Sequence, residues 1–272
     1  MPSLHDTGRR AADFLGLNAS MTAMIVLVVF LGLGEKIAER FLPLYLVALG
    51  GSTLAVGSLN AMDNLLSALY SFPGGWLSDR LGYKRALILF TLVAMLGYLL
   101  VILVPTWWAV FVGAIFFISW TAITLPAVMS MVSKAVPKAR RTMGVTVHSF
   151  VRRIPMALGP VIGGALIGVL GRVAGIRAAF IAAFILAAGA ILFVRRFMKD
   201  EPPERRVKSG GLLASLRFIS PPLRNLLVSD ILIRFAEQIP YAFVVLWVVD
   251  VNGQSALRFG ALTTIEMATA ML

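Results

Sequence analysis

Long apolar runs divide this sequence, and each is about as long as the roughly 20 residues that a helix needs to cross the hydrocarbon core of a membrane. Seven runs lie near residues 21–49, 54–77, 86–104, 107–133, 142–170, 174–197 and 224–250, and an eighth, 256–272, is cut short. Only helices and closed barrels satisfy their backbone polar groups in lipid, and these runs are too long for strands. They predict an all-α, polytopic membrane protein.

The composition agrees with this class and excludes several others. Only 14% of the residues are charged and the mean hydropathy is +0.88, whereas about 25% of a soluble domain is charged. The net charge of +12 matters less in a membrane protein than its placement, so we expect no nucleic-acid partner. The chain has no cysteine and only two histidines, His5 and His148. We therefore expect no metal, no cofactor and no enzymatic centre.

Basic residues alternate between the connections and predict the orientation. The connections near 49–54 and 104–107 carry no Lys or Arg, whereas those near 78–85, 133–141 and 195–224 carry fifteen. By the positive-inside rule, the N-terminus faces the cytoplasm, and we expect a bacterial-type inner (plasma) membrane. Arg172 and Arg177 are exceptions, because they fall on the outer side.

One charged segment divides the chain. Residues 198–223 are rich in charge and contain Pro202, Pro203, Gly210 and Gly211, which is typical of a solvated linker. It separates residues 1–197, expected to form a six-helix bundle, from residues 224–272, expected to begin a second bundle.

The second part repeats the first. KIAE at 36–39 matches RFAE at 234–237, and SxLxxGxLxxMD ending at Asp63 matches SxLxxGxLxxIE ending at Glu266. The two matches occur in order at similar offsets, and both repeats begin at the cytoplasm. This indicates a parallel repeat, as in transporters built from two six-span halves.

The strip between the second and third spans carries a motif. In GGWLSDRLGYKR, the residues Gly75, Asp79, Arg80, Gly82, Lys84 and Arg85 follow the pattern GxxxDRxGxKR, and we expect a tight cytoplasmic turn here. Together with the repeat, the strip resembles the major facilitator superfamily. The resemblance implies about twelve spans, so the chain looks like a fragment, and it implies that Asp79 latches onto a helix of the other half, span 11.

Ionisable residues inside the spans are costly and therefore candidates for function. The candidates for a substrate or proton pathway are Lys36, Glu39, Arg40, Asp63, His148, Arg152, Arg234, Glu237 and Glu266. Some, such as Lys36 and Glu39, could equally be structural ion pairs within one helix. The resemblance implies that spans 1, 4, 7 and 10 line a central path with spans 2, 5, 8 and 11 at its sides, which would place most of this set around one cavity.

These residues allow more than one chemistry. Desolvation disfavours the charged form of a carboxylate, so Asp63, Glu39, Glu237 and Glu266 are candidates for proton coupling. Lys36, Arg40 and Arg152 could instead bind an anionic substrate, because guanidinium groups fit carboxylates and phosphates. The same acids could attract a cationic drug, and the sequence does not decide among these.

The fifth span contains GPVIGG, whose Gly159, Pro160, Gly163 and Gly164 match the tail of a motif that the family associates with antiporters. The motif's usual preceding glycine is Pro155 here, and close helix packing by small residues is the competing interpretation. The fourth span also lacks the arginine common in the family's proton antiporters, which weakens an antiport assignment.

The sequence therefore predicts a secondary active transporter that moves a small solute by alternating access, with H+ as the coupling ion. A multidrug/proton antiporter and an organic-anion transporter are the alternatives within this class. A non-transporting receptor or scaffold on the same fold is the alternative outside it.

Overall fold

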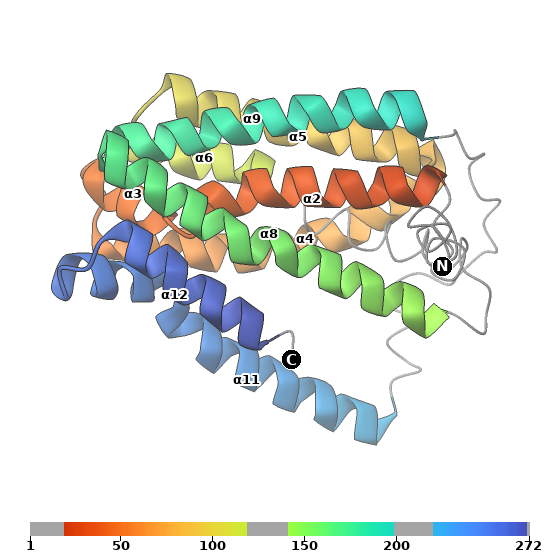
Figure 1. Cartoon of the computed structure of the whole chain (residues 1–272). Coiled ribbons are helices and arrows are strands. Elements are labelled where there is room, and N and C mark those ends of the chain that lie inside the picture. The colour runs from red at the N-terminus through yellow and green to blue at the C-terminus, as the bar shows by residue number, and fades with distance from the viewer. Residues whose placement is uncertain (1–18, 119–140, 199–219, 271–272) are drawn as a thin grey trace, which may run out of the picture.

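The computed structural model describes residues 19–118, 141–198 and 220–270, and within them the elements are helical. In chain order they are α2 (Ala19–Glu39), α3 (Leu42–Ala48), α4 (Thr53–Leu81), α5 (Tyr83–Leu103), α6 (Trp107–Phe117), α8 (Arg141–Leu170), α9 (Arg172–Phe197), α11 (Pro221–Leu246), the π-helical turn η2 (Trp247–Val251) and α12 (Ala256–Thr269). Figure 1 shows the long helices running side by side between two ends of one bundle.

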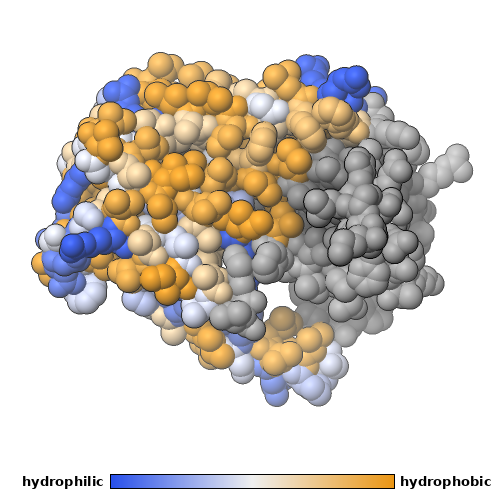
Figure 2. All heavy atoms as spheres, in the orientation of Figure 1, coloured by the Kyte–Doolittle hydropathy of each residue, from blue (hydrophilic) through white to orange (hydrophobic). Residues whose placement is uncertain are grey.

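The described helices begin and end within a few residues of the predicted spans, except in the fourth span, 107–133, where α6 covers the first part and residues 119–133 lie outside the described residues. Among the described residues, four helices are long and apolar enough to cross a membrane: Lys84–Leu103, Val151–Leu170, Arg172–Phe197 and Pro221–Val251. Large apolar side chains point outward from them, among them Leu96, Ile185 and Leu192. Figure 2 shows a mostly hydrophobic face between the two ends, with hydrophilic residues gathered mainly toward the ends. Such a surface suits lipid rather than water.

The first predicted span is two helices rather than one. Helix α2 ends at Glu39, and α3 begins at Leu42 with Pro43 in its first turn. A proline has no backbone N–H, and its ring clashes with the carbonyl of the residue four positions earlier, here Glu39, where α2 ends. The break therefore follows from Pro43, and it places Arg40 at the interruption.

The strip at 74–85 is also more helical than predicted. Helix α4 continues through Trp76 and Ser78 to Leu81, and α5 begins at Tyr83, so only Gly82 lies between them. Gly82 has φ 81° and ψ 150°, a backbone region that is essentially restricted to glycine. The expected tight turn is therefore a single-residue junction, and the charged residues on either side of it belong to helix ends.

Helix α2 is the centre of the packing, because it lies against both α8 and α9. A Cβ at Gly34 would lie 2.9 Å from the Cα of Ala183 on α9, and one at Gly159 of α8 would lie 2.7 Å from the carbonyl carbon of Lys36. Small residues let backbones approach this closely. Helix α5 packs on α9 and α6, and α12 packs along α8.

The internal repeat is visible in how its helices begin. The hydroxyl of Ser52 accepts a hydrogen bond from the N–H of Ala55 at the start of α4. Ser255, its counterpart in the repeat, accepts one from the N–H of Arg258 at the start of α12. Each serine satisfies an N–H that the helix itself leaves unpaired. The matched sequences thus start matched helices.

Candidate functional site

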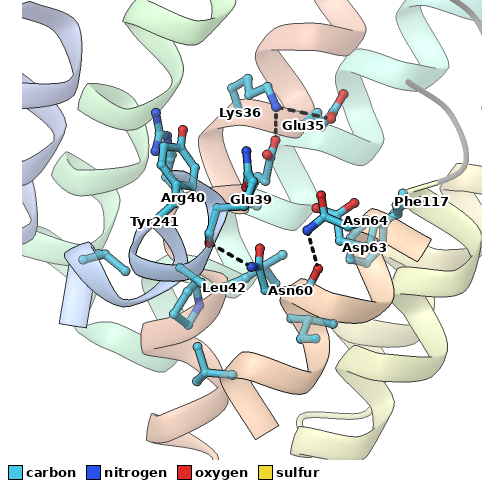
Figure 3. Close-up of a pocket in the computed structure, with 18 of the residues that line it drawn as sticks. Glu35, Lys36, Glu39, Arg40, Leu42, Asn60, Asp63, Asn64, Phe117 and Tyr241 are labelled. Atoms are coloured by element: carbon cyan, nitrogen blue, oxygen red, sulfur yellow. Dashed lines mark hydrogen bonds and ion pairs between the residues drawn. The ribbon is translucent and has the colours of Figure 1, made fainter. Parts of the chain in front are cut away.

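A cavity of about 410 Å³ lies where α2, α4, α11 and α12 face one another. Its charged and amide lining comprises Glu35, Lys36, Glu39, Arg40, Asn60, Asp63, Asn64, Glu237, Gln238 and Glu266. Its aromatic lining comprises Tyr98, Phe117, Phe180, Tyr241 and Phe259. Figure 3 shows Glu39 and Arg40 on one side and Asn60, Asp63 and Asn64 on another, with Tyr241 beside Arg40.

The first group is a set of ion pairs at the end of α2. The ammonium of Lys36 lies 3.5 Å from a carboxylate oxygen of Glu35 and forms a close ion pair with Glu39, one turn further on. All three side chains are at most about a third exposed. The predicted pairing of Lys36 with Glu39 is therefore present, yet both residues also line the cavity.

Arg40 connects the two repeats. Its guanidinium lies 3.8 Å from a carboxylate oxygen of Glu266 on α12 and 4.1 Å from the ring centroid of Tyr241 on α11. A cation over an aromatic ring is attracted by the ring's quadrupole. The break before Pro43 puts this residue at the end of α2, where it can reach across. The first-repeat cation is thus bound by a carboxylate and an aromatic ring of the second repeat.

A polar face of α4 forms the opposite wall. Asn60, Asp63, Asn64 and Ser67 are spaced i, i+3, i+4 and i+7, so they share one side of the helix. The Ser67 hydroxyl lies 3.4 Å from Asp63, and Asn60 donates to the backbone carbonyl of Gln238 on α11 at 3.2 Å. The sequence analysis singled out only Asp63 from this face, although the helical spacing of the amides around it was readable in the sequence.

Six of the nine predicted pathway residues line this cavity: Lys36, Glu39, Arg40, Asp63, Glu237 and Glu266. Arg234 is not among the described lining residues, because it lies on an exposed part of α11 and pairs with Asp230 at 2.8 Å. Arg152, half-buried on α8, is also absent from that lining. The side chain of His148 lies outside the described residues.

The sequence matches the family model of the Major Facilitator Superfamily over residues 16–272. The chain belongs to this family. It is therefore an integral, multi-pass membrane protein and, as members of the family are, a secondary transporter. The match spans both repeats and all the residues that line the cavity.

The family's strip between spans 2 and 3 can be followed in part. Gly82 forms the junction between α4 and α5, and the guanidinium of Arg80 lies 5.2 Å from the ring centroid of Trp76. Arg80 and Arg85 are exposed at this end of the bundle. The side chains of Gly75 and Asp79 lie outside the described residues, so the latch role of Asp79 stays a prediction.

The antiporter-associated glycines of the superfamily lie at close helix contacts. Gly159 and Gly163 face Lys36, Ile37 and Phe41 of the α2 region, whereas Gly164 faces Ala256 of α12, whose carbonyl oxygen would lie 2.5 Å from an added Cβ. Pro155, which replaces the motif's earlier glycine, packs against Gly32 of α2. At Gly168, four residues after Gly164, an added Cβ would meet nothing within 4 Å.

The two arginines that depart from the loop-charge pattern, Arg172 and Arg177, each have a partner. Arg177 donates to the carbonyl of Ile102 near the end of α5, at 2.6 and 3.1 Å. Arg172 pairs with Asp250 of η2 at 2.6 Å. Both charges therefore have structural partners. Among the described residues, no group of three or more His, Asp or Glu side chains is arranged to hold a metal ion.

Proposed function

We propose that this transporter moves a small solute by alternating access and couples the movement to protons. The observation that carries the proposal is the cavity between the repeats, which combines carboxylates from α2, α4, α11 and α12. Two pairs of these acids, Glu39 with Glu237 and Asp63 with Glu266, occupy matched positions of the repeat. A site shared by both halves can be exposed to either side when the halves rock.

Asp63 is the carboxylate that best suits proton exchange. Among the described residues, Asp63 receives one hydrogen bond, from the Ser67 hydroxyl. By contrast, Glu39 faces Lys36 and Glu266 faces Arg40. A carboxylate without a close cation has little to stabilise its charge in a low-dielectric setting. Asp63 can therefore alternate between protonated and ionised states as water reaches the cavity.

Proteoliposomes test this proposal. Solutes that raise the melting temperature of the full-length protein, found by screening metabolite and drug panels, are assayed for flux driven by a pH gradient. We expect Asp63→Asn and Glu39→Gln to abolish the gradient-driven component. Asp230→Asn, the same chemical change at an exposed position outside the described lining, is the matched control. Gradient-driven flux that survives both cavity changes would remove these residues from the coupling mechanism.

A specific observation favours an organic cation as the solute, and hence the multidrug/proton antiporter among the alternatives. The described lining contains five carboxylates, Glu35, Glu39, Asp63, Glu237 and Glu266, against two cations, Lys36 and Arg40, which leaves three negative charges in excess. Both cations already face carboxylates of the cavity. An anionic solute would have to displace these pairs, whereas a cation would meet acids and aromatic rings.

Probe solutes of opposite charge distinguish the two classes. We expect tetraphenylphosphonium to raise the melting temperature of the protein and benzoate to leave it unchanged. Glu237→Gln should weaken the response to tetraphenylphosphonium, because it removes one of the excess negative charges. Stabilisation by benzoate alone would favour the organic-anion alternative. Binding without flux of any solute would favour the receptor or scaffold alternative.

We also propose the orientation in which the N-terminus and the junction at Gly82 face the cytoplasm of a bacterial-type inner membrane. The basic residues around the helix ends at 80–85 and 195–196 support it. Residues 1–197 and 224–272 would then belong to the two rocking halves, with 198–223 as the linker between them.

A further inference from the structure

One part of the cavity already holds a cation that belongs to the protein. The guanidinium of Arg40 lies 4.1 Å from the ring centroid of Tyr241 and 3.8 Å from a carboxylate oxygen of Glu266. All three residues line the cavity, and Figure 3 shows Arg40 beside Tyr241. Aromatic rings recognise organic cations such as quaternary ammonium groups, and a nearby carboxylate adds a counter-charge. We call Tyr241 and Glu266 the ring–acid subsite; it suits a cation, and Arg40 occupies it.

The contacts of Arg40 with this subsite leave room for exchange. The Arg40 side chain is 13% exposed, whereas that of Glu266 is 55% exposed, so the carboxylate is open to water and to a solute. At 3.8 Å, the ion pair is also longer than a direct hydrogen bond of roughly 2.7–3.2 Å. Arg40 therefore does not saturate the carboxylate, and another cation can approach it.

The matched position of the second repeat carries no charge. Where the first repeat reads KIAER, the second reads RFAEQ, so Gln238 stands in the place of Arg40. The backbone carbonyl of Gln238 accepts a hydrogen bond from Asn60 of the first repeat at 3.2 Å, so this position also faces the opposite repeat. A neutral side chain is therefore compatible with the position, and the charge of Arg40 indicates a role that the repeat itself does not require.

We infer that Arg40 is a built-in competitor of the solute: it occupies the ring–acid subsite of the empty transporter, and a cationic solute displaces it. The displaced guanidinium has other counter-ions, because the described lining contains three more carboxylates than cations. Arg40 thereby determines specificity, since only a cation that binds the ring and the carboxylate better than Arg40 does can replace it.

The occupant indicates the chemical class of the solute. A guanidinium is planar, delocalised and weakly hydrated, whereas an ammonium is compact and strongly hydrated. Solutes that carry a guanidinium, quaternary ammonium or phosphonium group therefore compete best with Arg40. The inference rests on the cationic solute proposed above, and it does not require proton coupling.

Binding of tetraphenylphosphonium to the purified full-length protein tests the displacement, by isothermal titration calorimetry at one pH and without an ion gradient. We expect Arg40→Gln, which introduces the residue of the matched repeat position, to tighten binding about tenfold, because the ring and the carboxylate become free. Arg40→Lys keeps the charge but replaces the planar group with a strongly hydrated ammonium, so it should tighten binding about threefold. An effect of net charge alone would leave Arg40→Lys at the parental affinity.

Tyr241→Leu provides a second control, because it removes the ring without changing any charge. In this background, Arg40→Gln should tighten binding by less than about threefold, since Arg40 and the solute no longer compete for the ring. Size-exclusion profiles confirm that the variants fold. A gain of the same size with and without Tyr241 would assign the effect to long-range electrostatics and overturn the inference.

The remaining outcomes separate this inference from the proposed function. Tetraphenylphosphonium binding that does not tighten in either Arg40 variant would overturn the competitor role and leave the cationic solute standing. Benzoate binding that weakens in Arg40→Gln would show that Arg40 binds an anionic solute, and it would overturn both. Absence of tetraphenylphosphonium binding in every variant would also overturn the inference. Because binding is measured without a gradient, loss of proton coupling would leave the competitor role standing.

Discussion

Adding one methyl group at Gly159 should separate the two helices at the centre of the bundle. The new Cβ would lie 2.7 Å from both the carbonyl carbon and the Cβ of Lys36, about 0.7 Å short of the 3.4 Å at which ordinary contact begins. The carbonyl carbon is backbone in a helix, so it cannot rotate away. Helices α2 and α8 must move apart instead, and such overpacking costs about 1–3 kcal/mol.

Gly168→Ala is the control for this change. It adds the same methyl group to the same helix, where an added Cβ would meet nothing within 4 Å. There the higher helix propensity of alanine, about 1 kcal/mol, acts alone and favours the folded state. The two substitutions should therefore shift stability in opposite directions.

Thermal denaturation of the purified full-length variants measures the difference. We expect the Tm of Gly159→Ala to fall by roughly 5 °C and that of Gly168→Ala to stay or rise. Solute flux should fall in Gly159→Ala as well, because the displaced Lys36 lines the cavity. A Tm that falls equally in both variants would show that the glycines act through something other than the α2–α8 contact.

Two further predictions concern the strip between α4 and α5. Gly82→Ala should destabilise the protein by about 1–3 kcal/mol, because φ 81° with ψ 150° strains any residue with a Cβ. Thermal denaturation measures this loss, and Gly189→Ala, whose Cβ would meet nothing within 4 Å, is the control variant. Asp79→Asn in the full-length protein should lower solute flux in proteoliposomes while membrane insertion stays normal, as the family's latch implies, and unchanged flux would leave the strip with a role in topology alone.

Much of the fold could be read from the sequence, since lipid leaves a chain few choices. A run of about 20 apolar residues must satisfy its backbone internally, so its length and position predict a helix almost without tertiary information. The repeat could be read as well, because Ser52 and Ser255 act locally, each within the first turn of its own helix. The break in the first span was not predicted even though Pro43 was visible there, because Phe41 and Leu42 before the proline and residues 44–49 after it continue the apolar run.

The site was predictable only where a charge stood in an apolar run. Asp63, Glu237 and Glu266 were recognised in this way, whereas Asn60 and Asn64 were not, because an amide is a weaker signal than a charge. Arg152 and Arg234 met the same criterion as Asp63, yet neither is among the described residues that line the cavity. The rotation of a helix about its axis depends on its neighbours, and sequence periodicity describes only one helix at a time.

Contacts between distant helices were beyond the sequence altogether. Nothing near Arg40 in the chain indicates Glu266 or Tyr241, and nothing near Arg172 indicates Asp250. Close packing was one of two interpretations of the α8 glycines, and the sequence did not indicate their partners, which are α2 for Gly159 and Gly163 and α12 for Gly164. Local hydrophobicity and backbone chemistry determine which segments are helices and where they end. The partners of each side chain depend on how those helices are rotated and packed, which is a property of the assembled bundle.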